Sequence, residues 1–175
     1  MTEDMERIKK AAFNITTAFE GGGYGSFQNF DTGIISYGRF QFTLASGALF
    51  TLLEDYLQRA SGPTADGLRA YLPRVRDRDE SLRHDPEFKR LLREAAGDPL
   101  MQQAQDDLAT DKFWKLVQGL SIQPRNLHTP LGQALIFDMA INHGPRHNMI
   151  GLAEQALGVP SKSRVPDNGL QEPDL

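Results

Sequence analysis

Two carboxylates, Glu20 and Asp31, stand eleven residues apart on either side of a run of glycines. Glu20 ends an apolar-periodic segment at the negative pole of a helix dipole, and both surroundings are expected to raise its pKa. Asp31 follows in a polar turn. Glycoside hydrolysis uses two carboxyls in such different settings, because one protonates the leaving oxygen while the other activates water or attacks the sugar. The simpler alternative is that both residues lie on a solvated surface.

The composition describes an ordinary globular chain. Its 175 residues, 39% hydrophobic and 24% charged, suffice for one domain with a real core, and two lobes sharing a long helix would also fit. No apolar run approaches the roughly 18 residues of a membrane span, and the acidic N-terminus does not predict a signal peptide. The absence of cysteine excludes disulfides, thiolate catalysis and cysteine-type zinc sites. A net charge of -4 argues against nucleic acid as the main partner and suits a cationic substrate.

The first part of the chain must position the two carboxylates. Apolar residues at spacings of three and four predict a helix over residues 3 to 20, which the following glycines end. From residue 24 to 44 the period changes to two, which predicts a small antiparallel hairpin or three-stranded sheet with Asp31 in a turn. A further helix should begin at Ser46 and end before residue 61, and a weaker one should run from about 64 to 71.

The second part repeats one helix-start signal, a capping side chain followed by proline. It occurs at Asp85-Pro86, Asp98-Pro99 and Thr129-Pro130. The helix after Thr129 is apolar almost all round, which predicts a place in the centre of the fold, and Asp138 within it must find partners. Trp114 is expected in the core rather than stacked on a sugar.

The remaining segments carry weaker signals. Basic and acidic side chains alternate through residues 69 to 94, which favours a solvated helical face over a binding patch. One more helix is expected over residues 147 to 157, and residues 161–175 are expected to form an irregular tail or linker.

Several motifs are absent. The glycines after Glu20 lack the Lys-Ser or Lys-Thr of a phosphate-binding loop, and no serine lies in a nucleophile elbow. His143 and His147 have a metal-binding spacing, but Gly144-Pro145 breaks the helix between them. We therefore expect neither a metal site nor a cofactor.

Two stretches resemble a known family. LGQALIFDMAINHGP (residues 131–145) resembles the central-helix signature of the glycoside hydrolase family 46 chitosanases, and TGIISYG (residues 32–38) resembles the hairpin strand after their catalytic aspartate. The resemblance implies a mainly α (α+β), lysozyme-like, two-lobed fold with a small antiparallel sheet at the cleft and a long buried central helix. It places a single catalytic domain at residues 1–160.

The resemblance also implies an inverting mechanism, with Glu20 as general acid and Asp31 as the base that activates water, helped by Thr32. The two carboxyls would then lie about 6.5–9.5 Å apart. A compact arrangement of Glu, Asp and a hydroxyl residue is equally similar to phage-type lysozymes, in which case either Ser36 or Thr32 could supply the hydroxyl.

The resemblance also implies a supporting role for a residue of the central helix. Asp138 would belong to an ion-pair network that supports Glu20, and His143 closes the same helix. The hairpin supplies the side chains that are expected to contact substrate, namely Tyr24, Tyr37, Arg39 and Gln41.

The leading hypothesis is an endo-acting hydrolase of a β-1,4-linked amino-sugar polysaccharide, with chitosan as the substrate. The first alternative is a peptidoglycan muramidase, and the second is a lysozyme-fold module that binds glycan or a partner without cleaving it. The expected partner is a polysaccharide rather than nucleic acid or a membrane, and a monomer is expected. Such a substrate points to a secreted or cell-wall-directed protein.

Overall fold

The computed structural model describes residues 3–20 and 23–174, except for the side chains of residues 19, 20 and 168. It is mainly helical with one small antiparallel sheet, as predicted. The chain divides into two compact units, residues 20–108 and residues 1–19 with 109–175. The assignment of residues 1–160 to a single catalytic domain stays a prediction.

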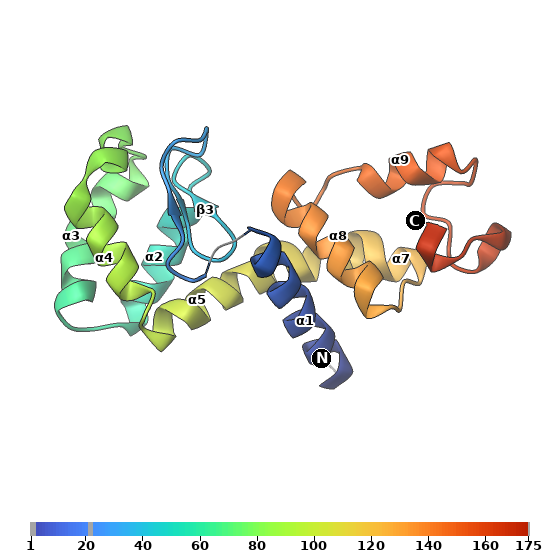
Figure 1. Cartoon of the computed structure of the whole chain (residues 1–175), viewed down its shortest axis with the longest axis horizontal. Coiled ribbons are helices and arrows are strands. Elements are labelled where there is room, and N and C mark those ends of the chain that lie inside the picture. Colours follow the sequence, from blue (N-terminus) through green and yellow to red (C-terminus); the bar gives the residue numbers. More distant parts are fainter. Residues whose placement is uncertain (1–2, 21–22, 175) are drawn as a thin grey trace. The chain divides into compact units, whose positions relative to one another are not determined.

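The unit of residues 20–108 contains a three-stranded antiparallel sheet in the order β1-β2-β3. Its strands are β1 (Phe27–Gln28), β2 (Ser36–Tyr37) and β3 (Phe42–Thr43) (Figure 1). In the register, Phe27 pairs with Tyr37 and Ser36 pairs with Thr43. Because each strand has only two residues, most of the chain between residues 24 and 44 lies in turns and loops. The predicted sheet is confirmed.

Within the described residues of this unit, five helices follow the sheet along the chain, and the first of them contacts strand β3. They are α2 (Ala48–Arg59), α3 (Pro63–Arg76), the 3-10 helix η1 (Glu80–His84), α4 (Pro86–Ala95) and α5 (Pro99–Ala109). Helix α3 contacts both α2 and α4 (Figure 1). Completely buried side chains from α2, α3 and α4 form the core of this unit, among them Leu52, Leu53, Leu68, Phe88 and Leu92.

The helix starts confirm the capping prediction. The Asp85 carboxylate accepts hydrogen bonds from the backbone N–H groups of Glu87 and Phe88, both at 3.0 Å. Helix α3 is longer than predicted and continues past Pro73 to residue 76.

The second unit contains most of the remaining helices. They are α1 (Glu3–Glu20), η2 (Thr110–Trp114), α6 (Lys115–Val117), η3 (Gln118–Ile122), α7 (Gln123–Arg125), α8 (Pro130–His143), α9 (Met149–Ala156), η4 (Asp167–Gly169) and η5 (Glu172–Asp174). Residues 110–125 are helical without a break, and η2 and η3 are π-helical segments within them. Helix α1 has the predicted bounds.

Three aromatic rings form one centre of this unit. Phe13 stacks on Phe137 with ring centroids 4.7 Å apart, and Trp114 meets the edge of Phe137 at 5.8 Å. Trp114 is only 1% exposed, which confirms its predicted place in the core.

A buried ion pair holds α7 to α9. The Arg125 guanidinium donates to both carboxylate oxygens of Glu154, at 2.7 and 2.9 Å, and the two side chains are 4% and 1% exposed. Burial works against the Glu154 carboxylate, but the hydrogen bonds and charge of Arg125, together with the backbone N–H groups of Lys162 and Ser163, lower the Glu154 pKa. Removing one partner would strand a buried charge, so this contact ties the end of the long helical run firmly to α9.

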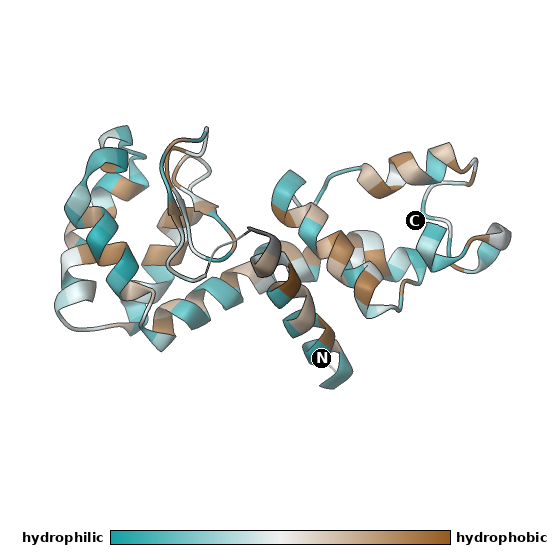
Figure 2. Cartoon of the chain, viewed as in Figure 1, coloured by the Kyte–Doolittle hydropathy of each residue, from teal (hydrophilic) through white to brown (hydrophobic). Residues whose placement is uncertain are grey.

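Helix α8 is not buried on all sides. Phe137 and Ala140 lie in the core, but Leu131 and Leu135 are 74% and 51% exposed. Figure 2 shows hydrophobic residues along the visible side of this helix. Helix α8 therefore packs into the core of its unit through one side, and the side that carries Leu131 and Leu135 is not covered by the described parts of that unit.

The C-terminal segment packs back on its unit. Leu170 is 4% exposed, and the Glu172 carboxylate accepts hydrogen bonds from the backbone of His128 and Thr129 and from the Thr129 hydroxyl. Burial opposes ionisation of Glu172, but these hydrogen bonds lower its pKa. The segment is irregular, with two short 3-10 turns, yet it fixes the start of α8. None of the described helices is long and apolar enough to cross a membrane.

Candidate active site

Asp31 is held by its own turn. One carboxylate oxygen accepts a hydrogen bond from the backbone N–H of Gly33 at 2.9 Å, and the other accepts from the Ser36 hydroxyl at 2.9 Å. The first contact is the usual way in which an aspartate closes a turn two residues on. The structure thus brings together two of the predicted site residues, Asp31 and Ser36, whereas Thr32 is exposed beside them.

Gly33 makes this close packing possible. A Cβ atom at this position would lie 2.8 Å from the Thr43 side chain and 3.0 Å from both Asp31 Oδ1 and Ser36 Oγ. Real Cβ atoms do not approach neighbours at 2.8 Å, so any larger residue would push the carboxylate or its hydroxyl partner away. Glycine is therefore required here by space rather than by backbone conformation.

A residue from η1 holds the loop from outside. The Arg83 guanidinium donates long hydrogen bonds, both 3.4 Å, to the backbone carbonyls of Asp31 and Ile34. In the opposite direction, the Asn29 side chain donates to the backbone carbonyl of Arg83 at 2.8 Å. Residues before and after Asp31 are thus tied to the same short helix.

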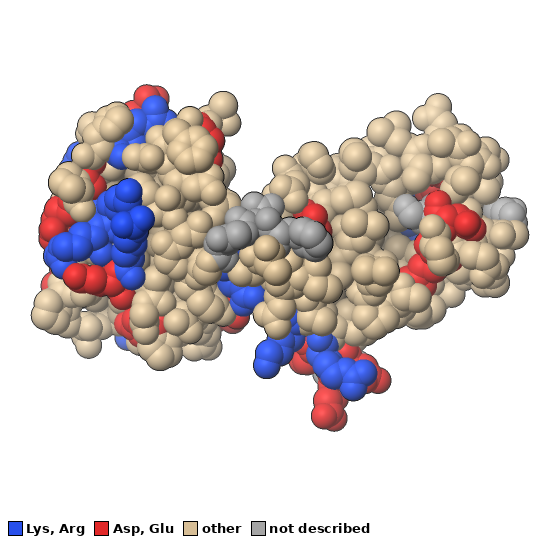
Figure 3. All heavy atoms as spheres, viewed as in Figure 1, with Lys and Arg blue, Asp and Glu red and all other residues tan. Residues whose placement is uncertain are grey.

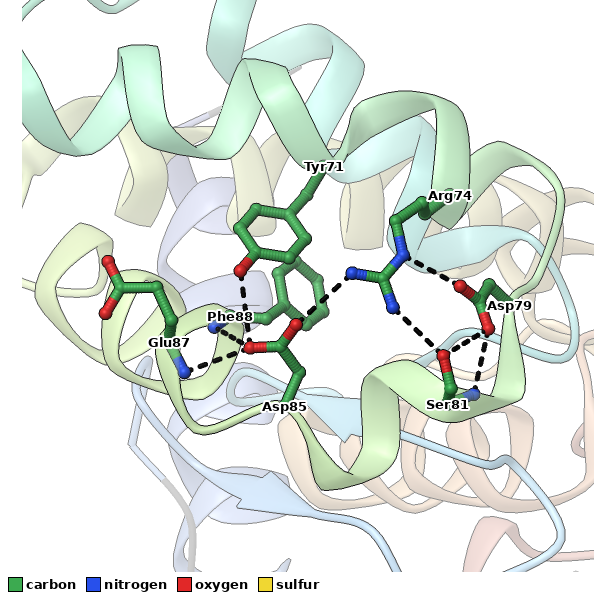
Figure 4. Close-up of polar contacts among 7 residues, drawn as sticks. All are labelled: Tyr71, Arg74, Asp79, Ser81, Asp85, Glu87 and Phe88. Carbon is green, nitrogen blue, oxygen red and sulfur yellow. Dashed lines mark hydrogen bonds and ion pairs between the residues drawn. The ribbon is translucent and has the colours of Figure 1, made fainter.

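η1 itself is fixed by a charged network around Arg74 of α3 (Figure 4). Arg74 donates to Asp79 at 2.7 Å, to the Ser81 hydroxyl at 2.9 Å and to Asp85 at 3.2 Å. Asp79 and Asp85 flank η1 in sequence, so one guanidinium joins both ends of it to α3. The loop around Asp31 is therefore hydrogen-bonded to a short helix that is itself fixed to α3.

Both carboxylates of the network are stabilised in their charged form. Hydrogen bonds from Ser81, and then from Arg74, lower the pKa of Asp79 to about 2. Burial opposes ionisation of Asp85, but four hydrogen bonds together lower the Asp85 pKa, from the Phe88 N–H, Arg74, Tyr71 and the Glu87 N–H. The alternating charges of residues 69 to 94 were expected to form a solvated face; many of them are exposed, and Arg74, Asp79 and Asp85 among them also form this specific network.

Two predicted substrate contacts, Tyr24 and Arg39, bond to each other. Arg39 donates to the Tyr24 hydroxyl at 2.9 Å and to Asp106 at 3.0 Å, and the Tyr24 hydroxyl donates to Asp106 at 3.0 Å. Burial, followed by the charge of Asp106, raises the pKa of Tyr24. Gln105 completes the cluster by accepting from the Arg39 N–H and donating to the Tyr24 carbonyl.

The other two hairpin residues also have internal partners. Tyr37 is completely buried and its hydroxyl donates to the Leu92 carbonyl at 2.7 Å. It joins β2 to α4, and burial raises its pKa. Gln41 is half-buried and donates to the Ser26 hydroxyl and the Gly38 carbonyl, both at 3.0 Å. The structure places Tyr37 in the core and Gln41 at a turn.

The predicted residues of α8 belong to the other unit. Asp138 Oδ1 is buried without a hydrogen-bond partner in the described parts of the chain, and Oδ2 is 3.5 Å from the Asn142 amide nitrogen. The expected arginine or backbone-amide partners of Asp138 are therefore not found there. His143 is exposed, and its ring centroid lies 6.3 Å from that of His147.

Helix α1 ends at Glu20, as predicted, but the side chain of Glu20 and the residues Gly21 and Gly22 lie outside the described residues. The separation of its carboxyl from that of Asp31 stays a prediction. Within the described residues no group of three or more histidine, aspartate or glutamate side chains is arranged to hold a metal ion.

Sequence reasoning missed Asn29, Arg83 and Arg74. Arg83 lies some fifty residues after the turn it contacts, and it sits in a run of mixed charge that gave no hint of an inward-facing arginine. Asn29, two residues before Asp31, could have been singled out as a turn residue.

Comparisons with known proteins bear on this geometry. The sequence profile of glycosyl hydrolase family 46 matches residues 11–172. The chain belongs to this family. It is accordingly a glycosidase. A search of curated protein sequences found no match.

Solved structures of chitosanases are similar over almost the whole chain. A native chitosanase from Bacillus subtilis MY002 is 24% identical with a TM-score of 0.74, covering 98% of this chain and 73% of its own. A glutamate-to-alanine mutant chitosanase from Bacillus subtilis MY002, complexed with 6 GlcN, is 22% identical with a TM-score of 0.73 and the same coverage. A Gynuella sunshinyii chitosanase complexed with chitotetraose is 21% identical with a TM-score of 0.74, covering 99% and 74%. These similarities confirm the predicted mainly α, lysozyme-like fold class.

Proposed function

We propose that this glycosidase cleaves a β-1,4-linked amino-sugar polysaccharide, with chitosan as its substrate, Glu20 as general acid and Asp31 as the base. The observation that carries the proposal is the Asp31 turn, in which each carboxylate oxygen accepts one hydrogen bond, from Gly33 or from Ser36. A carboxylate oxygen has a second acceptor position, so Asp31 can also accept a proton from water while its orientation stays fixed.

Ser36 supports this role. Because its hydroxyl donates to Asp31, its own lone pairs are left to accept a hydrogen bond from the same water. Thr32, the other candidate hydroxyl, is exposed at the tip of the turn. We therefore assign the water-orienting role to Ser36 ahead of Thr32.

The substrate class is supported by the similar structures. Two of them hold glucosamine oligomers or chitotetraose, and one such complex was obtained with a glutamate-to-alanine mutant, as expected where a glutamate is needed for turnover. The net charge of -4 favours a cationic polymer over an anionic one.

One observation favours the muramidase alternative. Lys89, Arg90 and Arg93 of α4 form a basic patch over this helix (Figure 3). Arg90 is paired with Glu87 and Glu94, but Lys89 and Arg93 form no salt bridge among the described residues. A positive patch attracts the anionic bacterial wall and repels chitosan.

The experiment is reducing-end release from chitosan and from peptidoglycan, measured side by side. The wild type is compared with Glu20→Gln and with Glu54→Gln, a charge-matched control at an exposed site on α2. We expect release from chitosan, lowered by orders of magnitude in Glu20→Gln only. Release from peptidoglycan alone would favour the muramidase, and equal rates for Glu20→Gln and the wild type would contradict the catalytic assignment.

A further inference from the structure

Phe30, directly before Asp31, is held out into solvent. It is 82% exposed, the highest value among the large hydrophobic side chains of the described residues. Burying a phenylalanine side chain normally stabilises a fold, and this position does not gain that stabilisation. Single exposed hydrophobic residues are common on protein surfaces, so exposure alone carries no conclusion.

The backbone around Phe30 is fixed on both sides. Asn29 bonds to the Arg83 carbonyl at 2.8 Å, and Asp31 bonds to Gly33 and Ser36 at 2.9 Å. The ring is therefore not exposed because the loop is loose. A braced loop that presents an aromatic ring to water is an arrangement suited to binding.

Phe30 also differs in kind from the other exposed hydrophobic residues. Within the described residues the others are aliphatic or methionine side chains: Ile15, Leu131, Leu135, Met149, Leu152 and Leu157. Phe30 alone in this set offers a flat π face. It also lies one residue, about 3.8 Å along the backbone, from the proposed base.

We propose that Phe30 is a stacking platform for a glucosamine ring of the substrate next to the bond that is cleaved. The C–H groups on one face of a pyranose can lie against the ring. The protonated amino group of glucosamine is in addition attracted to the negative face of the aromatic ring. This proposal rests on the proposed substrate class and makes Phe30 a substrate-binding residue, with no part in proton transfer.

Kinetics give the first test. Phe30→Ala should raise KM for chitosan about 5- to 10-fold and change kcat less than about 2-fold, because a contact made equally in ground and transition states alters binding only. Phe30→Tyr keeps the aromatic face and should restore KM to within about 2-fold of the wild type. An unchanged KM in Phe30→Ala would overturn the proposal.

Fluorescence gives a second test that does not depend on turnover. The chain has one tryptophan, Trp114, which is 1% exposed, so Phe30→Trp adds a single exposed reporter. In the Glu20→Gln background, glucosamine hexamer should quench and blue-shift this tryptophan with a saturable titration. Leu131→Trp, at a site 74% exposed in the other unit, is the matched control and should not respond.

The two tests separate this proposal from the proposed function. An inactive wild type whose Phe30→Trp variant responds to the hexamer would contradict chitosan cleavage and support the platform. An active wild type with a silent Phe30→Trp variant would overturn the platform alone. An equally strong response to the neutral N-acetylglucosamine hexamer would overturn the proposed attraction between the Phe30 ring and the protonated amino group.

Discussion

Two aspartates for which a role is predicted, Asp31 and Asp138, stand in opposite surroundings. Both oxygens of Asp31 accept a hydrogen bond at 2.9 Å from residues of its own turn. Asp138 has one buried oxygen without a partner in the described chain and one weak contact of 3.5 Å with Asn142. Asp31 is thus oriented by two hydrogen bonds, whereas Asp138 has only one weak contact among the described residues.

The difference between the two aspartates shows which groups can orient a carboxylate in a turn and which can do so in a helix. A turn supplies its own donors, so Asp31 is fixed by residues within five positions of it. A helix has no spare backbone donors in its middle, so Asp138 depends on side chains from other elements. In the unit that contains Asp138, Leu131 and Leu135 of α8 are also exposed, so the described residues leave one side of this helix uncovered.

Among the substitutions that test this comparison of Asp31 with Asp138, Gly33→Ala is expected to have the largest effect on activity. The added Cβ would collide with Thr43 and crowd Asp31 and Ser36, so the carboxylate must move. We expect kcat to fall about 100-fold and stability to drop by about 1–3 kcal/mol, measured by chitosan hydrolysis and urea unfolding. The control is Gly119→Ala, where a Cβ meets nothing within 4 Å. Normal activity in Gly33→Ala would contradict the described packing.

A smaller effect is expected from replacing each aspartate by asparagine. Asp31→Asn loses one hydrogen bond of a charged acceptor and should cost about 1 kcal/mol. Asp138→Asn removes a charge from an unpartnered buried oxygen and should leave the free energy of unfolding unchanged or slightly higher. Urea unfolding at neutral pH measures both. Equal losses would show that Asp138 is as well bonded as Asp31.

The smallest effect is expected for the stability that the ionised Asp79 carboxylate beside η1 contributes, which should depend on pH. The pKa of Asp79 is lowered from 3.8 to about 2, so the folded state is favoured above the ordinary pKa and this contribution is lost as pH falls from about 4 to 2. The melting temperature of the wild type should exceed that of Asp79→Asn at pH 5, and the difference should shrink steadily as pH falls from about 4 to 2. Asp77→Asn, which removes the same charge from an exposed pair with Arg76, is the matched control. A difference as large at pH 2 as at pH 5 would contradict the assignment.

The sequence predicted what local chemistry determines. Asp85, Asp98 and Thr129 each mark a helix start because a capping oxygen and a following proline act on adjacent residues. The Asp31 turn followed from residue types for the same reason. Trp114 was placed in the core because its neighbours in sequence share one helix face.

Contacts between distant segments could not be predicted. Nothing near Arg83 in sequence indicates that it faces the Asp31 loop, and nothing in β2 distinguishes Tyr37 from a solvent-facing residue. All residues from 35 to 40 are buried, so the alternation that normally separates two sheet faces fails in these strands. The exposure of Leu131 likewise depends on what packs beside α8.

The most direct test of the account is azide rescue of Asp31→Ala. If Asp31 activates water in an inverting reaction, its loss should lower kcat on chitosan about 10²- to 10⁴-fold. Azide needs no base, so it should restore part of the rate and yield the α-glycosyl azide, whereas Asp138→Ala should gain nothing from azide. A folded Asp31→Ala variant that keeps wild-type activity, or one that azide leaves inactive, would contradict the central claim.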